Sequence, residues 1–105
     1  MYEAAVAKNP NDSEALAGLG DVAHAEHDLV GAQGFYKRAL AANPTYLPAL
    51  VGLGDVQWES GSRDAAQKTY KDVVDRFPDG SYPPRAKERA EGSVGAAAPD
   101  LQGSP

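Results

Sequence analysis

The pentapeptide Gly18-Leu19-Gly20-Asp21-Val22 returns 34 residues later as Gly52-Leu53-Gly54-Asp55-Val56. Tyr2, Tyr36 and Tyr70 keep the same spacing. Three dipeptides that end in proline also follow at this interval: Asn9-Pro10, Asn43-Pro44 and Phe77-Pro78. A fixed period between about 20 and 50 residues is typical of a solenoid, in which each repeat buries its apolar face against the next one. The sequence therefore predicts stacked repeats.

Apolar residues recur three and four positions apart within each period, which predicts two helices per repeat. In the first repeat the expected helices cover about 13–26 and 30–42, with Asp12 or Ser13 and Asp28 as N-caps. In the first of these helices the apolar residues at this spacing are Leu16, Leu19, Val22 and Ala23. The positions expected to face the core are Ala32, Phe35, Tyr36, Ala39 and Leu40, then Leu50, Leu53, Val56, Ala66, Tyr70, Val73 and Val74. Tyr36 and Tyr70 should therefore occupy equivalent buried sites.

Glycines mark two special positions in the repeat. Gly61 suits a left-handed turn between two helices, whereas its counterpart His27 tolerates positive φ less well, so we expect that turn to be slightly strained or differently shaped. Gly20 and Gly54 fall inside helices, where each costs about 1 kcal/mol relative to alanine. A cost repeated at the same place indicates close backbone contact with the partner helix.

This pattern resembles the tetratricopeptide repeat, a helix–turn–helix unit of about 34 residues. The residues that carry the resemblance are Leu16, Leu19, Gly20, Ala32, Tyr36, Ala39 and Pro44, then Leu50, Leu53, Gly54, Ala66, Tyr70 and Pro78. The resemblance covers residues 2–91 and implies an all-α, right-handed superhelical solenoid of about six helices. Two departures are visible: Leu16 and Leu50 stand where the family has a bulky aromatic residue, and Ala23 and Gln57 stand where it has a later tyrosine.

The same resemblance divides the chain into a repeat domain, 1–91, and a low-complexity C-terminal tail, 92–105. The domain would comprise a half repeat at 1–12, repeats at 13–46 and 47–80, and a capping helix at 83–91. Lys87 stands where a repeat needs leucine, so this last helix should be a polar one that shields the open end of the stack. The tail is rich in Gly, Ala, Ser and Pro and cannot order itself alone. We expect part of 96–105 to lie extended against a groove or helix face, with Leu101 in an apolar spot.

Composition excludes several classes of function. The net charge is −5 without clustered Lys or Arg, which argues against nucleic-acid binding. The absence of cysteine excludes disulfides, thiolate catalysis and cysteine-based zinc sites. The chain has no run of 18 or more apolar residues, so the sequence predicts no membrane helix. The cytoplasm and the bacterial periplasm both fit this composition.

In the tetratricopeptide family, ligands lie in a concave groove lined by the first helix of each pair. The residues of this chain that fall there, and that we predict to contact a partner, are Glu14, Ala17, Asp21, His24, Val51, Asp55, Trp58 and Glu59. The acidic side chains favour a basic or neutral peptide, although the charges could instead simply solvate an exposed face. Trp58 could anchor a partner, but we favour packing against the following helix near Pro83 and Pro84.

The sequence gives little support for a metal site or for catalysis. His24, His27, Asp28 and Asp21 have a spacing that could suit a metal, but no further ligand is evident, so we predict no metal and no cofactor. No serine is placed beside either histidine, so we predict no catalytic residues and no enzymatic activity. Two functions remain: a scaffold module that binds a peptide or helical segment in the acidic groove, or a structural segment of a longer array. A structural segment of this kind could form homo-oligomers through exposed repeat ends.

Overall fold

The computed structural model describes Ala4 and residues 7–92, and this part of the chain is helical without any strand. The helices are α2 (Ser13–Ala25), α3 (Leu29–Ala42), α4 (Leu47–Glu59), α5 (Arg63–Arg76) and α6 (Pro84–Ala90). The described residues ahead of Asn9 are helical as well. The prediction of an all-α fold with about six helices is therefore confirmed. The expectations for Tyr2 and for the tail, including Leu101, fall outside the described residues.

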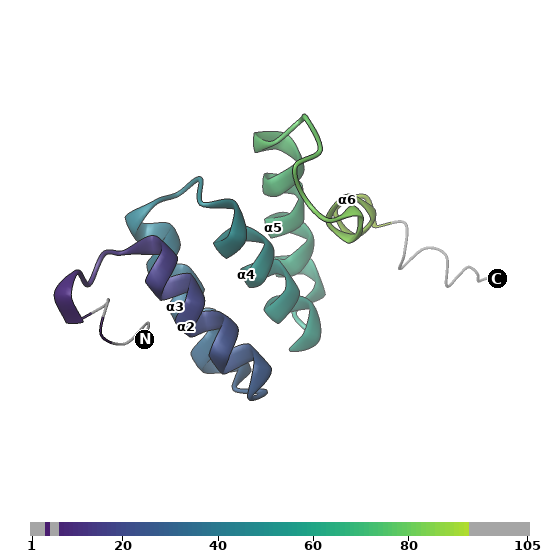
Figure 1. Ribbon diagram of the computed structural model, residues 1–105. Helices are drawn as coiled ribbons and strands as arrows, with labels where there is room; N and C mark the ends of the chain where they lie inside the picture. Colours follow the sequence, from purple (N-terminus) through teal and green to yellow (C-terminus); the bar gives the residue numbers. More distant parts are fainter. Residues whose placement is uncertain (1–3, 5–6, 93–105) are drawn as a thin grey trace.

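The helices form pairs that stack one after another. Helix α2 packs against α3, and α4 packs against α5. A short turn connects the two helices of each pair. Contacts between α3 and α4 and between α5 and α6 join successive pairs, and α2 also contacts α4 directly. Figure 1 shows this order as a progression from the purple and blue N-terminal pair to the yellow-green α6. The first helices of neighbouring pairs therefore lie side by side.

Local chemistry fixes where the first pair begins and turns. The Asp12 carboxylate accepts a hydrogen bond from the Ala15 amide at 3.1 Å, and Asp28 accepts one from the Gly31 amide at 3.0 Å. The turn between the two helices places His27 at φ 62°, and the matching Gly61 has φ 90°. A left-handed conformation costs a non-glycine residue about 1–2 kcal/mol, so the strain expected at His27 is confirmed.

Two clusters of apolar residues make up the core, and each contains one buried tyrosine. Tyr36 lies in the first cluster, built from α2, α3 and α4, and Tyr70 lies in the second, built from α4, α5 and α6. Leu40 packs against both clusters, so the core is continuous along the stack. Fully buried alanines, such as Ala32 and Ala66, allow the helices of each pair to approach closely.

The tyrosine rings explain why glycines recur inside the helices. A Cβ atom added to Gly20 would lie 2.7 Å from the Tyr36 ring, and one added to Gly52 would lie 2.5 Å from it. Gly54 has the same relation to Tyr70, at 2.8 Å. The glycines thus provide close contact as expected, but the partner is an aromatic ring and not the backbone of the facing helix. Tyr36 is held between α2 and α4, so it joins two repeats.

Replacing Gly52 with alanine should lower the free energy of unfolding by about 1–3 kcal/mol, because the added methyl overlaps a ring that has no room to move. Gly34→Ala is the matched control, since no atom lies within 4 Å of a Cβ built at that position. The control should raise stability by up to about 1 kcal/mol through helix propensity alone. Urea denaturation followed by circular dichroism measures both changes. Equal effects of the two substitutions would contradict this account of the core.

Candidate functional site

Helices α2 and α4 contact each other, and we call the surface that lies along this contact the α2–α4 face. Its charged or polar members are Glu14, Asp21, His24, Asp55 and Glu59. The buried tyrosines reach this surface with their hydroxyl groups: Tyr36 donates a hydrogen bond to Asp21, and Tyr70 donates one to Oδ1 of Asp55 at 2.6 Å. The same bond therefore occurs in both repeats.

Burial and these carboxylates alter the acidity of both tyrosines. The pKa of Tyr70 is raised to about 12, first by burial and then by the hydrogen bond to Asp55, while Arg89 opposes the shift. Burial also raises the pKa of Tyr36, with further contributions from the hydrogen bond to Asp21 and from the charges of Asp21 and Asp55. Both acids thus act on one hydroxyl group, which places two negative charges near each other on the face.

His24 belongs to a contact between helices. Its Nε2 atom lies 2.5 Å from Oε2 of Glu59, which links α2 to α4. Asp28, which the sequence placed in a possible metal cluster with His24, instead caps α3. Within the described part of the chain, no three side chains of the metal-binding types come together. The two residues of the His24–Glu59 pair, both predicted to contact a partner, contact each other.

The Asp55 carboxylate already interacts with two arginines of α6. The Nε and Nη2 atoms of Arg85 donate to the two carboxylate oxygens at 3.0 and 2.6 Å. Arg89 lies 3.7 Å from Oδ1 and donates to the Tyr70 hydroxyl at 2.9 Å. The hydrogen bond to Asp55 raises the pKa of Arg85 above its ordinary value. Charge-assisted, bidentate pairs of this kind are the strong ones among hydrogen bonds.

Asp21, the counterpart of Asp55, is in a different situation. It is exposed to solvent, and among the described residues no arginine or lysine pairs with it. The positions on α4 that correspond to Arg85 and Arg89 hold Val51 and Asp55. Asp21 therefore keeps an accessible negative charge, which within the described part of the chain accepts a hydrogen bond from the Tyr36 hydroxyl.

Trp58 packs against α6, as the sequence favoured, and Arg89 of that helix lies over its ring. The guanidinium groups of Arg63 and Arg89 lie 4.1 and 4.5 Å from the centre of its ring. The ring also meets Tyr70 in an edge-on contact, with centroids 6.3 Å apart. Two cation–π contacts and one aromatic contact leave the indole half-buried. Trp58 is therefore a packing residue in this conformation of the chain.

The remaining predicted site residues divide by exposure. Glu14 is exposed on the first turn of α2, but Ala17 and Val51 lie in the core with exposures of 4% and 9%. Because neighbouring helices cover them, these two offer a partner little surface. Sequence reasoning missed Arg85 and Arg89. Their spacing of four residues on the capping helix expected after the second repeat was the available signal.

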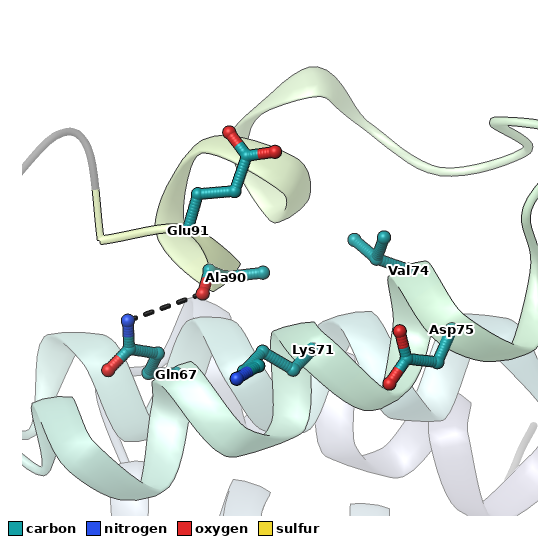
Figure 2. A pocket seen from close by; sticks show the side chains of 6 residues that line it. All are labelled: Gln67, Lys71, Val74, Asp75, Ala90 and Glu91. Atoms are coloured by element: carbon teal, nitrogen blue, oxygen red, sulfur yellow. Dashed lines mark hydrogen bonds between the residues drawn. The ribbon is translucent and has the colours of Figure 1, made fainter.

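Two hollows in the surface of the described residues lie beside α6, at the C-terminal end of the stack. A pocket of about 440 Å³ opens between α5 and α6; its lining residues are Gln67, Lys71, Val74, Asp75, Ala90 and Glu91. Figure 2 shows the Gln67 amide donating to the Ala90 carbonyl oxygen across this pocket, at 3.2 Å. A smaller one, of about 240 Å³, adjoins Trp58, Arg63 and Arg89. Both depend on the position of α6.

Comparison with known families and proteins supports a repeat protein. A family model described as "Tetratricopeptide repeat" matches residues 23–88, which is more than half of the chain. Comparison with curated proteins gives no match. None of the helices in the described residues has the length and apolar character needed to cross a membrane.

The raised pKa of the tyrosines predicts how stability depends on alkaline pH. A phenol whose pKa is higher in the folded than in the unfolded state stabilises the fold fully below the unfolded value of 10.0, and this contribution is lost as the pH rises further. For Tyr70 the window lies between pH 10 and about 12. Urea denaturation across this range should show a slope about 1.4 kcal/mol per pH unit smaller in Tyr70→Phe than in the wild type. Identical slopes would contradict the assigned environment of Tyr70.

Proposed function

Because the chain belongs to the tetratricopeptide-repeat family, whose repeats mediate protein–protein interaction, we propose that it binds a basic peptide or helical segment of another protein on the α2–α4 face. Members of this family are typically non-catalytic interaction modules. Asp21 is the residue on which recognition centres in this proposal. His24 and Glu59 border it across the contact between α2 and α4, and Glu14 adds a negative charge at the start of α2.

The observation that carries the proposal is the pairing of Asp55 with Arg85. It shows which group the aspartate of this repeat accepts when a cation comes within reach, namely an arginine that engages both carboxylate oxygens. Asp21 has the same tyrosine partner and the same place in its helix, but it is exposed. A partner that supplies an arginine or lysine would therefore complete at Asp21 what α6 completes at Asp55.

The electrostatics of the face favour the same class of partner. Asp21 and Asp55 both act on the pKa of Tyr36, and the chain as a whole carries a net charge of −5. An acidic surface steers cationic partners toward it and disfavours acidic ones. The rim position of Asp21 makes this attraction sensitive to salt. Asp55 contributes less, because Arg85 neutralises it locally.

A second candidate function is self-assembly through the ends of the stack. The observation that favours it is the exposure of two valines on the N-terminal pair, Val22 at 45% and Val30 at 84%. Apolar side chains exposed at the end of a repeat stack can pair with another copy. This function would use the end of the stack and not the α2–α4 face.

Asp21→Asn should weaken binding of a basic helix by about fivefold, the effect expected for a half-exposed charge pair, while keeping an acceptor for the Tyr36 hydroxyl. The probe is a blocked helical peptide with two arginines four residues apart, titrated into ¹⁵N-labelled protein with amide shifts as the readout. The control Asp75→Asn removes the same charge from α5 and should leave the affinity unchanged. Raising the salt concentration should weaken binding to the wild type.

Two results would contradict the proposal. One is equal affinity of Asp21→Asn and the wild type; the other is a set of shifted amides that excludes α2 and α4. Sedimentation velocity without peptide tests the second candidate, because self-assembly predicts dimers at micromolar concentration and recognition predicts a monomer.

A further inference from the structure

We propose that α6 occupies a second recognition site within its own chain, and that a partner helix with two arginines four residues apart, each followed by a small residue, binds there in its place. The site consists of Asp55, Trp58, Tyr70 and the apolar residues beneath α6. The inference rests on the proposed function for the general role, protein recognition. It adds a neighbouring surface, which shares Asp55 with the α2–α4 face and has a defined partner chemistry.

The two arginines of α6 supply its polar contacts with this site. Arg85 holds both oxygens of Asp55, and Arg89, one turn later, donates to the Tyr70 hydroxyl while its guanidinium lies over Trp58. Residues four apart share one face of a helix, so a single helix can make both sets of contacts at once. Lysine could not reproduce them, because it lacks the planar fork that pairs with two carboxylate oxygens and stacks on a ring.

The residue after each arginine sets the fit against the core. Ala86 and Ala90 are buried, with exposures of 0% and 6%, in the cluster that contains Leu50, Val51 and Tyr70. Ala86 is also the 34-residue counterpart of Gly52, which contacts the ring of Tyr36. A larger side chain at either position would hold the helix away from Asp55. The chemistry that fits is therefore arginine and a small residue, repeated after four positions.

The way in which α6 is held allows it to exchange. It has only seven residues, and the side chains that it buries are those of two alanines. In its ion pairs the Arg85 side chain is 44% exposed and that of Arg89 is 24% exposed, whereas the Asp55 side chain is 15% exposed. Short segments with few apolar contacts open before the rest of a fold. By contrast, α4 and α5 bury leucine, valine and tyrosine side chains.

The surface that α6 would leave determines what can replace it. Asp55 would lose its paired cation, and Trp58 and Val51 would lose their cover. This surface would combine a carboxylate, an indole ring and apolar side chains. A ligand that fits it needs a cationic group and small side chains on the face that contacts the apolar residues, as α6 has. A longer partner helix with the same pattern gains helicity that a helix of seven residues lacks. Exchange lowers the apparent affinity of the partner by the fraction of time that α6 is open.

The test compares the full chain with variants that weaken α6. The probe is a labelled, blocked peptide in which residues 83–91 are extended with alanine and lysine to about 16 residues, so that it is helical enough to compete. Arg85→Gln should bind this peptide at least about fivefold more tightly than the wild type, because α6 is open more often. Lys87→Gln removes the same charge from the exposed side of the same helix and should change nothing. Arg89→Gln provides a second variant if Arg85→Gln does not fold, as judged by circular dichroism.

In a second peptide, leucine replaces both alanines while the charge stays the same. For this peptide Arg85→Gln should show no gain in affinity over the wild type. Equal binding of both peptides, or equal affinity of Arg85→Gln and Lys87→Gln, would overturn the inference. Exchange of α6 between two copies, detected as a dimer of Arg85→Gln that excludes the peptide, would also overturn it. Asp21→Asn separates this inference from the proposed function: an effect there without one at Arg85 leaves only the proposed function, and the reverse leaves only the second site.

Discussion

The contact of a tyrosine ring with a glycine of the neighbouring helix is the constraint on which the whole structure depends. Tyr36 fits between α2 and α4 only because Gly20 and Gly52 have no side chains, and Tyr70 fits against Gly54 in the same way. This close approach carries each hydroxyl group through the helix pair to an aspartate on the far surface. Packing and surface chemistry are therefore linked, because the acids of the α2–α4 face are also the acceptors for the buried phenols.

The two repeats differ in what happens beyond this shared bond. At Asp55 the charge is balanced within the chain by Arg85, so the acid holds α6 in place. At Asp21 the adjacent positions carry Val51 and Asp55, so the charge remains open to solvent. One repeated aspartate thus serves as an internal anchor in one repeat and as the proposed contact for a partner in the other. The difference arises from the helix that follows each repeat and not from the repeat itself.

Much of the fold could be predicted from the sequence, because the spacing of residues such as Tyr36 and Tyr70 states the repeat directly. The strain at His27 could also be predicted, since a repeat shows where glycine is missing. The environment of the acids could not. Arg85 reaches Asp55 across 30 positions, a contact that depends on how α6 lies beside α4 and not on the period of 34. The burial of Ala17 and Val51 escaped prediction for the same reason, because small apolar residues suit both a surface and a helix contact.

A double-mutant cycle between Tyr36 and Asp21 tests the central link between packing and surface most directly. The free energy of unfolding is measured for the wild type, Tyr36→Phe, Asp21→Ala and the double variant. If the hydroxyl and the carboxylate act as one unit, loss of the hydroxyl should cost about 1 kcal/mol in the wild type and close to nothing in Asp21→Ala. Additive effects of the two substitutions would show that the surface acids and the buried tyrosines are independent, which would contradict the account.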